Sequence, residues 1–240
     1  MSAATALDKL LEEYRAQVLR WNRQINLVSR RESAGRLTGL IQQCRSAWDD
    51  LMAARPAGLE SASGLWYFDL GSGAGLPGFV WHHQAIQSGL GIRTWLVEPR
   101  EKRAWFLDRL NHLEGAVPAT VVAGRWGDPE SGILAGDAAP SHILVSLKAL
   151  HLTDPEVLAG LAPVLAQLPE EGSPPVLIAR FYPSEQVWSE ELAGDLDIPP
   201  AGEERIHGRY RFLAKGGRIL APGLRGGAGL VLSEYLAESS

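Results

Sequence analysis

Hydrophobic residues in the first 55 positions recur at the three- and four-residue spacing of amphipathic helices. They form two stripes, which comprise Leu7, Leu10, Leu11, Tyr14, Val18, Trp21 and Ile25 in the first and Leu37, Leu40, Ile41, Cys44, Trp48, Leu51 and Met52 in the second. Each stripe has to be buried, either against the other helix or against the rest of the protein. Because Pro56 and Gly58 end the second helix, we expect a helical cap over residues 1–58 and a second domain over residues 59–240.

After residue 65 the pattern changes to short hydrophobic or β-branched runs that alternate with helical spacing. The expected strands are 66–70, 94–98, 119–123, 142–147 and 175–180, and the expected helices are 77–88, 100–113, 153–167 and 184–193. This alternation predicts a parallel α/β sheet covered on both faces. Two further strand-like runs, 205–214 and 228–236, have no helix between them, and the segment joining them includes Gly216 and Gly217. We therefore expect a C-terminal antiparallel hairpin at the edge of the sheet.

A glycine-dense turn follows the first expected strand, and an acid ends the second. Gly71, Gly73 and Gly75 lie in the turn, and Glu98 follows about twenty residues after its last glycine, Gly78. Glycine adopts positive φ readily and lets backbone N–H groups approach a ligand closely. An acid at the end of the next strand accepts hydrogen bonds from ribose hydroxyls. The sequence therefore predicts a nucleoside site.

The turn can be interpreted in two registers. The run Gly73-x-Gly75-x-x-Gly78 matches the nicotinamide dinucleotide fingerprint, although the glycine that directly follows the strand is Gly71. Counted from Gly71, the third glycine of that fingerprint is replaced by Leu76. The pattern that starts at Asp69, Asp-x-Gly-x-Gly-x-Gly, is typical of S-adenosylmethionine (SAM) methyltransferases. Together with the strand order it favours a class I, Rossmann-like methyltransferase fold; a dinucleotide enzyme and a purely structural turn are the alternatives.

The composition indicates the class of protein and the compartment in which we expect it. The 240 residues are 45% hydrophobic and 21% charged, which are globular values, and no run approaches the length of a membrane span. Cys44 is the only cysteine, and the N-terminus has neither a basic region nor an apolar stretch, so we expect a cytoplasmic protein without disulfides. The net charge of −5 argues against a generally cationic nucleic-acid binder.

The charge is unevenly distributed along the chain. Residues 205–225 hold six basic and no acidic residues, which leaves −11 on the remainder. Such a run is either a solvated face or an edge that contacts phosphates.

Three stretches together carry a family resemblance. They are Trp21-Asn22-Arg23-Gln24-Ile25-Asn26-Leu27-Val28-Ser29, the ten residues 69–78, and Leu96-Val97-Glu98 with Lys102-Arg103 and Phe106-Leu107 after it. They resemble the bacterial 16S ribosomal RNA guanine-N7 methyltransferase family, also called glucose-inhibited division protein B. The resemblance is continuous from residue 14 to about residue 113 and is weaker beyond.

The resemblance implies S-adenosylmethionine as cofactor and a role for each residue that matches. Asp69 would contact the cofactor's amino group and Glu98 its ribose hydroxyls, although a loop-stabilising carboxylate and a helix N-cap are the structural alternatives. Arg125 and Trp126 are expected near the adenine, where Trp126 could equally be a core residue. The remaining cofactor contacts are expected from Gly71, Ser72, Gly73, Gly75, Leu76 and Ser146.

The substrate side departs from the family pattern. Only Ser46 remains of the family's His-x-x-Asp-Ser element, and after the fourth strand the positive charge moves one place, to Lys148. Lys148 and Arg180 lie at strand ends beside the expected crevice, so they are our candidates for catalytic contacts with substrate, with ordinary surface positions as the alternative. His82 and His83 have no third ligand at a suitable spacing, so we expect no metal site.

These patterns rank three functions. The first is a SAM-dependent methyltransferase, a monomer, that modifies N7 of a guanine in 16S ribosomal RNA or the small subunit and contacts RNA through residues 205–225. The second is the same enzyme class with another acceptor, which could be a small molecule, a protein or another RNA. The third is a degenerate SAM-binding module without catalysis.

Overall fold

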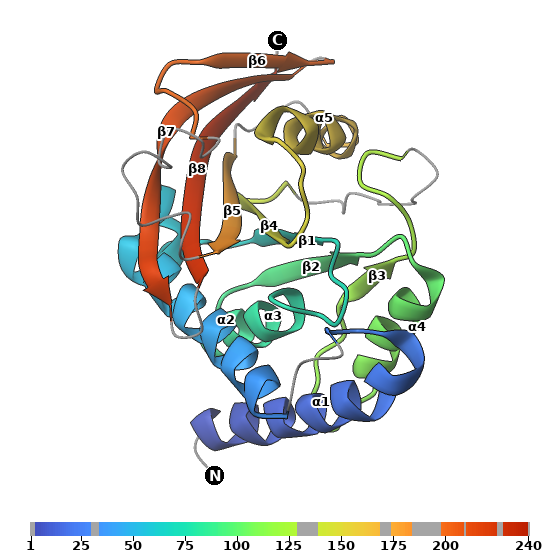
Figure 1. Cartoon of the computed structure of the whole chain (residues 1–240). Coiled ribbons are helices and arrows are strands. Elements are labelled where there is room, and N and C mark those ends of the chain that lie inside the picture. Colours follow the sequence, from blue (N-terminus) through green and yellow to red (C-terminus); the bar gives the residue numbers. More distant parts are fainter. Residues whose placement is uncertain are drawn as a thin grey trace.

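The protein is built around one eight-stranded sheet in the order β3-β2-β1-β4-β5-β8-β7-β6 (Figure 1). The computed structural model describes residues 3–29, 34–128, 139–168, 174–183, 198–208, 210–224 and 228–239. The strands are β1 (Leu65–Leu70), β2 (Ile92–Val97), β3 (Thr120–Val122), β4 (His142–Lys148), β5 (Pro175–Pro183), β6 (Glu204–His207), β7 (Tyr210–Leu224) and β8 (Ala228–Ser239). Strands β1 to β5 pair in parallel, and β8, β7 and β6 extend the sheet antiparallel. The predicted mostly parallel sheet with an antiparallel end is confirmed.

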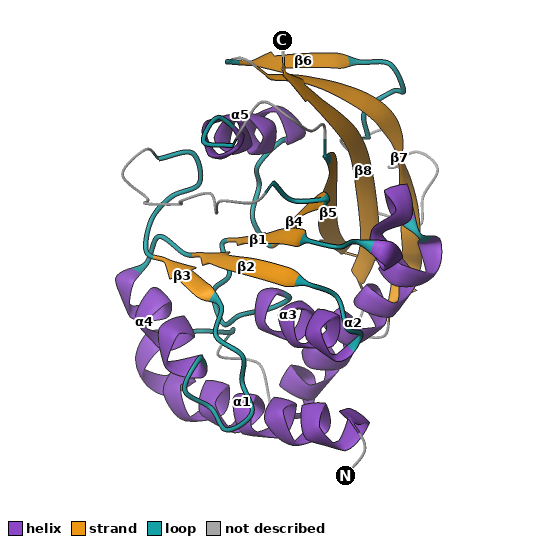
Figure 2. Ribbon diagram, turned by 180° about the vertical axis from the view of Figure 1, so that it is seen from behind, coloured by secondary structure: helices purple, strands orange, loops and turns teal. Residues whose placement is uncertain are grey.

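The described helices divide between the two faces of the sheet (Figure 2). They are α1 (Ala3–Ile25), α2 (Ala34–Ala54), the short 3₁₀ helix η1 (Pro56–Ser61), α3 (Gly78–Gln87), α4 (Glu101–Leu110) and α5 (Asp154–Leu165). Helices α1 to α4 share one hydrophobic core with one face, and α5 packs on the other face.

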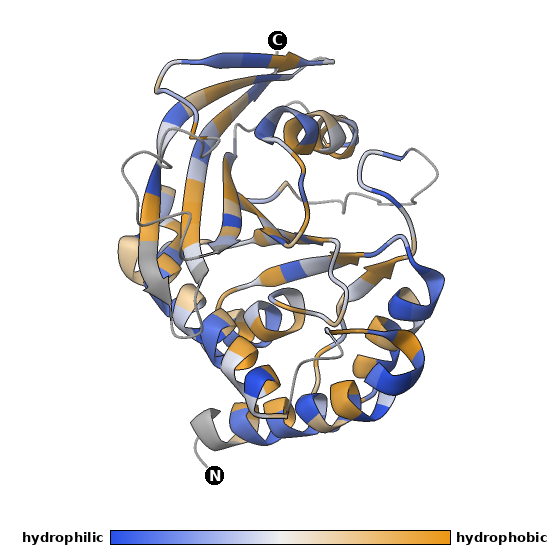
Figure 3. Cartoon of the chain, viewed as in Figure 1, coloured by the Kyte–Doolittle hydropathy of each residue, from blue (hydrophilic) through white to orange (hydrophobic). Residues whose placement is uncertain are grey.

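The central strand β1 shows why the sheet needs cover on both sides. All six of its residues are buried, and successive side chains point to opposite faces. Leu65 and Tyr67 pack with α1 to α4, whereas Trp66 and Phe68 pack with α5. In Figure 3 the central strands are mostly hydrophobic, while the helices alternate hydrophobic and hydrophilic residues. A strand buried on both faces therefore appears in the sequence as a continuous hydrophobic run.

The two N-terminal helices pack directly on α3. Tyr14 of α1 stacks on Phe79 with ring centroids 4.9 Å apart. The indole N–H of Trp81 donates to the carbonyl of Cys44 in α2 at 2.8 Å. Both stripes predicted from the sequence are thus buried against the sheet domain as well as against each other, and the division at residues 58 and 59 stays a prediction.

The C-terminal prediction was wrong in detail. Residues 205–214 are not one strand, because the chain turns at Gly208 and forms β6 and β7. Gly216 and Gly217 lie inside β7, at a bulge opposite β8, instead of in the hairpin loop. The helix expected at 184–193 lies outside the described residues. Within the described ranges, no helix is long and apolar enough to cross a bilayer.

Candidate functional site

The glycine turn lies at the carboxyl end of β1, between β2 and the start of α3. Gly71, Gly73 and Gly75 all have positive φ, at 69°, 56° and 94°. The N–H groups of Gly71 and Ser72 donate to the carbonyl of Val97, at 2.8 and 3.1 Å, and tie the turn to β2. Three left-handed positions within five residues would strain any other residue type, which explains the glycine spacing.

Asp69 is the buried acid of this site, with 1% of its surface exposed. The Ser146 hydroxyl on β4 donates to its Oδ1 at 2.6 Å, and the Gly78 N–H donates to its Oδ2 at 3.2 Å. Since the Ser146 proton points at Asp69, the Tyr67 hydroxyl is the donor in its 2.8 Å bond with Ser146. Burial raises the pKa of Asp69 to about 6, although these hydrogen bonds and Lys148 favour the ionised form.

Helix α3 begins against this carboxylate. A Cβ at Gly78 would lie 2.4 Å from the Asp69 Oδ2 and 2.5 Å from the Leu96 Cδ2, so only glycine fits at this position. The negative charge of Asp69 therefore sits where the N-terminus of α3 would otherwise receive an anion. A pyrophosphate would be repelled from this helix end, which counts against the dinucleotide interpretation and fits a ligand that carries a cationic amino group.

Glu98 follows β2 and is 3% exposed. Its Oε2 accepts from the Gly73 N–H at 2.9 Å, and its Oε1 accepts from the Arg100 N–H at 3.0 Å. Each carboxylate oxygen can accept a further hydrogen bond, so Glu98 joins the turn to α4 and keeps acceptor capacity for a ligand hydroxyl. The structural and the ligand-binding interpretations of Glu98 are thus compatible.

Helix α1 contacts the same turn directly, and the residue after the helix contacts α4 beside it. The Tyr14 hydroxyl donates to the Ala74 carbonyl at 3.0 Å. The Arg103 guanidinium donates to the Asn26 carbonyl at 2.7 Å, close to Gly73. Sequence reasoning missed Tyr14 and Tyr67 as supports of the site, although Tyr67 lies two residues before Asp69 and hence on the same face of β1.

The two predicted substrate contacts are separated by the sheet. In the β4–β5 register Lys148 pairs with Phe181, and Arg180 pairs with Leu147. Lys148 is half-buried and, by strand alternation, lies on the face of Ser146 and Asp69, where its charge favours the ionised Asp69. Arg180 is buried on the opposite face, so the structure does not bring the two cations together.

Arg180 is held by α5. Its guanidinium donates to the Asp154 carboxylate and to the Leu152 carbonyl. The Tyr235 hydroxyl donates to the other oxygen of Asp154 at 2.7 Å. This paired, buried arginine joins β5 to the start of α5 and is not directed at the crevice.

Trp126 is also part of the α5 face. Its indole N–H donates to the Val157 carbonyl at 2.9 Å, and its ring lies 5.3 Å from that of Phe68. A Cβ at Gly160 would lie 2.3 Å from the Trp126 Nε1, so the indole packs on the helix backbone. These contacts favour the core interpretation of Trp126, while Arg125 beside it is exposed.

The basic segment 205–225 is largely neutralised in the part that the structure describes. Arg205 pairs with Glu203, Arg211 pairs with Glu204 and Glu238, and Arg218 pairs with Glu234. Arg209 and Arg225 lie outside the described residues. Glutamates that precede or follow the segment, most of them on a neighbouring strand, thus reduce its apparent charge.

The two histidines of α3 are buried in the core. The His82 Nε2–H donates to the Val117 carbonyl at 3.0 Å, and its Nδ1 accepts from the Thr94 hydroxyl at 2.8 Å. Burial lowers the pKa of His82 to about 4, with a smaller contribution from His83. Among the described residues, no three His, Cys, Asp or Glu side chains gather into a metal site.

Comparison with known proteins identifies the family to which the chain is similar. The family model for GidB, rRNA small subunit methyltransferase G, matches residues 7–135. A protein named ribosomal RNA small subunit methyltransferase G from Cereibacter sphaeroides is 35% identical over 145 residues, which are 59% of this chain and 65% of that protein, just under two thirds of its length. A protein of the same name from Xanthomonas oryzae pv. oryzae is 28% identical over 211 residues, 85% of this chain and 86% of that protein.

The fold recurs in solved structures. Phosphoethanolamine N-methyltransferase 1 of Haemonchus contortus, solved in complex with phosphoethanolamine and S-adenosylhomocysteine, superposes with a TM-score of 0.50 at 8% identity, covering 100% of this chain and 50% of that chain. At this identity the match concerns the fold alone, and it confirms the predicted Rossmann-like methyltransferase fold.

Proposed function

This chain belongs to the GidB family of rRNA small subunit methyltransferase G proteins, and we propose that it is a SAM-dependent methyltransferase that modifies N7 of a guanine in small-subunit ribosomal RNA. The relatives are named for small-subunit rRNA, which supports an RNA substrate. Modification of ribosomal RNA would place the protein in the cytoplasm, where we propose that it acts as a monomer.

The observation that carries the cofactor assignment is the buried carboxylate at the start of α3. Asp69 accepts the Gly78 N–H, so the helix end offers a negative charge instead of a site for phosphate. Glu98 stands across the turn with acceptor capacity for ribose hydroxyls. An amino-acid group and a ribose are the two parts of S-adenosylmethionine that such a pair would hold.

We assign the cofactor contacts to the turn itself and to its neighbours. Gly71, Ser72, Gly73 and Gly75 offer a backbone without Cβ obstruction at three of four positions, and Leu76 continues the turn. Ser146 would act through Asp69, whose carboxylate it orients. Trp126 packs on α5, so we no longer assign it to the adenine. Arg125 is exposed and keeps its proposed role beside the adenine.

The chemistry asks little of the protein beyond positioning. Bound S-adenosylmethionine supplies a methyl group on a positively charged sulfur. Guanine N7 has a lone pair and no proton, so the reaction needs no general base, and alignment of the reactants can lower the barrier by about 7–11 kcal/mol. Lys148, on the face of Asp69, is our candidate for contact with the guanine or its phosphate. Arg180 is proposed to act indirectly, since it fixes β5 against α5.

The RNA would extend beyond the guanine. Within 205–225 the exposed Lys215 is the candidate phosphate contact, because Arg205, Arg211 and Arg218 already contact glutamates. We therefore expect this edge to contribute a smaller salt dependence than its sequence charge indicates.

Transfer of tritiated methyl groups from S-adenosylmethionine tests the function. Small-subunit RNA that lacks the modification should be labelled by the wild type and not by Asp69→Asn, whereas Asp8→Asn, which alters an exposed carboxylate on α1, should retain activity. Labelling of a small molecule or a protein in place of RNA would favour the other acceptor classes. Cofactor binding without transfer to any RNA would favour a non-catalytic module.

A further inference from the structure

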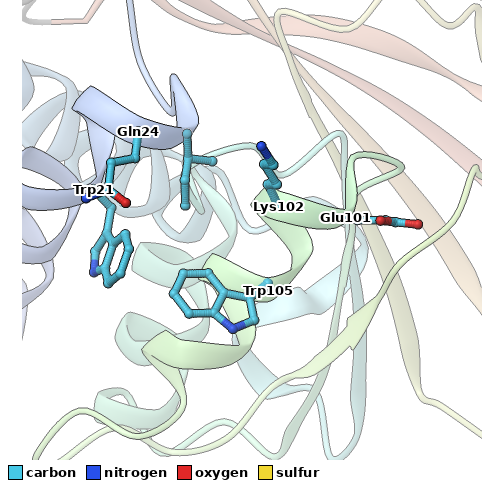
Figure 4. A pocket seen from close by; sticks show the side chains of 6 residues that line it. Trp21, Gln24, Glu101, Lys102 and Trp105 are labelled. Carbon is cyan, nitrogen blue, oxygen red and sulfur yellow. The ribbon is translucent and has the colours of Figure 1, made fainter.

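A cleft between α1 and α4 brings two tryptophans together at the protein surface (Figure 4). Trp21, Gln24 and Ile25 line it from the last turns of α1, and Glu101, Lys102 and Trp105 line it from the start of α4. Its volume is about 370 Å³, within the range of small-molecule sites. The cofactor assignment leaves this cleft without a role.

Trp105 is exposed as a binding surface would be, whereas Trp21 packs partly against the hydrophobic core and supports it. Trp105 is 48% exposed, although tryptophan is usually well buried. Its ring meets that of Trp21 edge to face, with centroids 4.9 Å apart and planes at 76°. The Arg109 guanidinium carbon lies 5.4 Å from the Trp21 centroid and 5.9 Å from the Trp105 centroid, which fixes the pair through cation–π contacts.

A second cleft of about 460 Å³ continues the first toward the glycine turn. The two share Ile25, Glu101 and Lys102, and the second adds Asn26, Pro99, Arg100 and Arg103. Three of these side chains are cationic and only Glu101 is acidic, so the second cleft suits an anion despite the net negative charge of the chain. Pro99 directly follows Glu98, so the path ends beside the proposed cofactor site.

We propose that the two clefts bind single-stranded RNA, with one unpaired base stacked on Trp105 and its phosphates held by Lys102 and Arg100. This inference rests on the proposed RNA substrate and extends it to a second contact outside the methylation site. Exposed aromatic rings beside a basic groove are how proteins bind single strands irrespective of sequence. The amide of Gln24 in the cleft offers a donor and an acceptor to a base edge.

The contents of the clefts favour RNA over a hydrophobic protein segment. A protein segment would need apolar surface along the whole path, but five of the seven residues that line the second cleft are polar or charged, and three of these are cationic. A nucleotide combines a flat π face with a negative phosphate, and the path offers an indole at one end and arginine and lysine at the other.

Fluorescence anisotropy with a labelled twelve-nucleotide single-stranded RNA tests the proposal on the full-length protein. Trp105→Leu should weaken binding about tenfold, the loss of one base stack, and Trp105→Phe should restore most of the affinity. Neither change removes a charge, so the slope of log affinity against log salt should stay constant, whereas Lys102→Gln should reduce its magnitude by about 0.7. Val117→Ala, which trims a 43% exposed residue outside both clefts and outside residues 205–225, is the matched control.

The outcomes separate this inference from the proposed function. RNA affinity unchanged in Trp105→Leu, or a wild type that does not bind the probe at low salt, overturns the inference, even if small-subunit RNA is methylated. Probe binding with the expected variant pattern supports it, even if no RNA is methylated and the proposed function fails. Because Trp105 is half exposed, the leucine variant should fold, and an unchanged thermal midpoint would show this.

Discussion

Two buried titratable groups, Asp69 and His82, should make opposite contributions to the pH dependence of the free energy of unfolding. Burial raises the pKa of Asp69 to about 6 and lowers the pKa of His82 to about 4. Between pH 3.8, the pKa of an ordinary aspartate, and about pH 6, the folded protein holds a proton on Asp69 that the unfolded chain releases. Asp69 therefore makes stability fall as the pH rises through this range. His82 stays neutral in the folded protein while the unfolded chain takes up a proton below pH 6.5, so it makes stability rise with pH.

The two effects are similar in size. The pKa of Asp69 moves from 3.8 to about 6, which corresponds to about 3 kcal/mol of unfolding free energy lost as the pH rises through that window. The pKa of His82 moves from 6.5 to about 4, which corresponds to about 3 kcal/mol lost as the pH falls through its window. In the wild type the two contributions should nearly cancel from pH 4 to pH 6.

Single substitutions should expose each contribution. In Asp69→Asn the amide can donate to Ser146 while its oxygen accepts from Gly78, so the buried shape is kept without a charge. The free energy of unfolding of this variant, relative to the wild type, should rise by about 2 kcal/mol from pH 4 to pH 7, because part of the full effect lies below pH 4. His82→Gln should change in the opposite sense over the same range, because it loses the histidine contribution and keeps that of Asp69.

Urea denaturation followed by circular dichroism, at constant ionic strength and half-unit steps of pH, measures these differences. Comparison with the wild type at each pH cancels the other titrating groups. A constant difference between Asp69→Asn and the wild type from pH 4 to pH 7 would refute the argument, since the carboxyl would then titrate alike in both states. A cationic ligand at Asp69 should favour its ionised form, so SAM affinity should decline below about pH 6 in the wild type only.

The glycines give further predictions. Gly78→Ala should destabilise the protein by about 1–3 kcal/mol and abolish SAM binding in calorimetry, because its Cβ would overlap the Asp69 carboxylate; tight binding by a well-folded variant would contradict the site. Gly160→Ala should cost a similar amount in thermal denaturation, since its Cβ would overlap the Trp126 indole. Gly39→Ala, in α2 with open space around it, should instead stabilise by about 0.5–1 kcal/mol; a loss of stability in thermal denaturation would contradict the open helical position assigned to Gly39.

The sequence predicted the parallel half of the fold well because its strands are buried on both faces. Strand β1 is buried at every position, so its hydrophobic run is unbroken and easy to locate. The antiparallel end was harder. Gly217 packs where a Cβ would lie 2.8 Å from Ile198 and 2.9 Å from the Leu232 carbonyl, so this glycine marks close packing within β7 and not a loop.

The site was predictable where chemistry follows from local sequence. Asp69, the glycines and Glu98 are defined by their spacing from strand ends, and in the structure each carboxylate accepts the N–H of one glycine, Asp69 from Gly78 and Glu98 from Gly73. The face on which a strand-end residue lies depends on register between strands, which the sequence of one strand does not contain. In the β4–β5 register Lys148 pairs with Phe181, one residue beyond Arg180. Lys148 and Arg180 therefore lie on opposite faces of the sheet, and Arg180 faces α5.

The central claim is that this chain places a methyl group on a guanine of small-subunit ribosomal RNA. Mass spectrometry of nucleosides from small-subunit RNA, taken from a strain that lacks the gene, tests it most directly. We predict that 7-methylguanosine is reduced in that RNA, that the wild-type gene restores it, and that the Asp69→Asn variant does not. An unchanged level of 7-methylguanosine in the deletion strain would contradict the account.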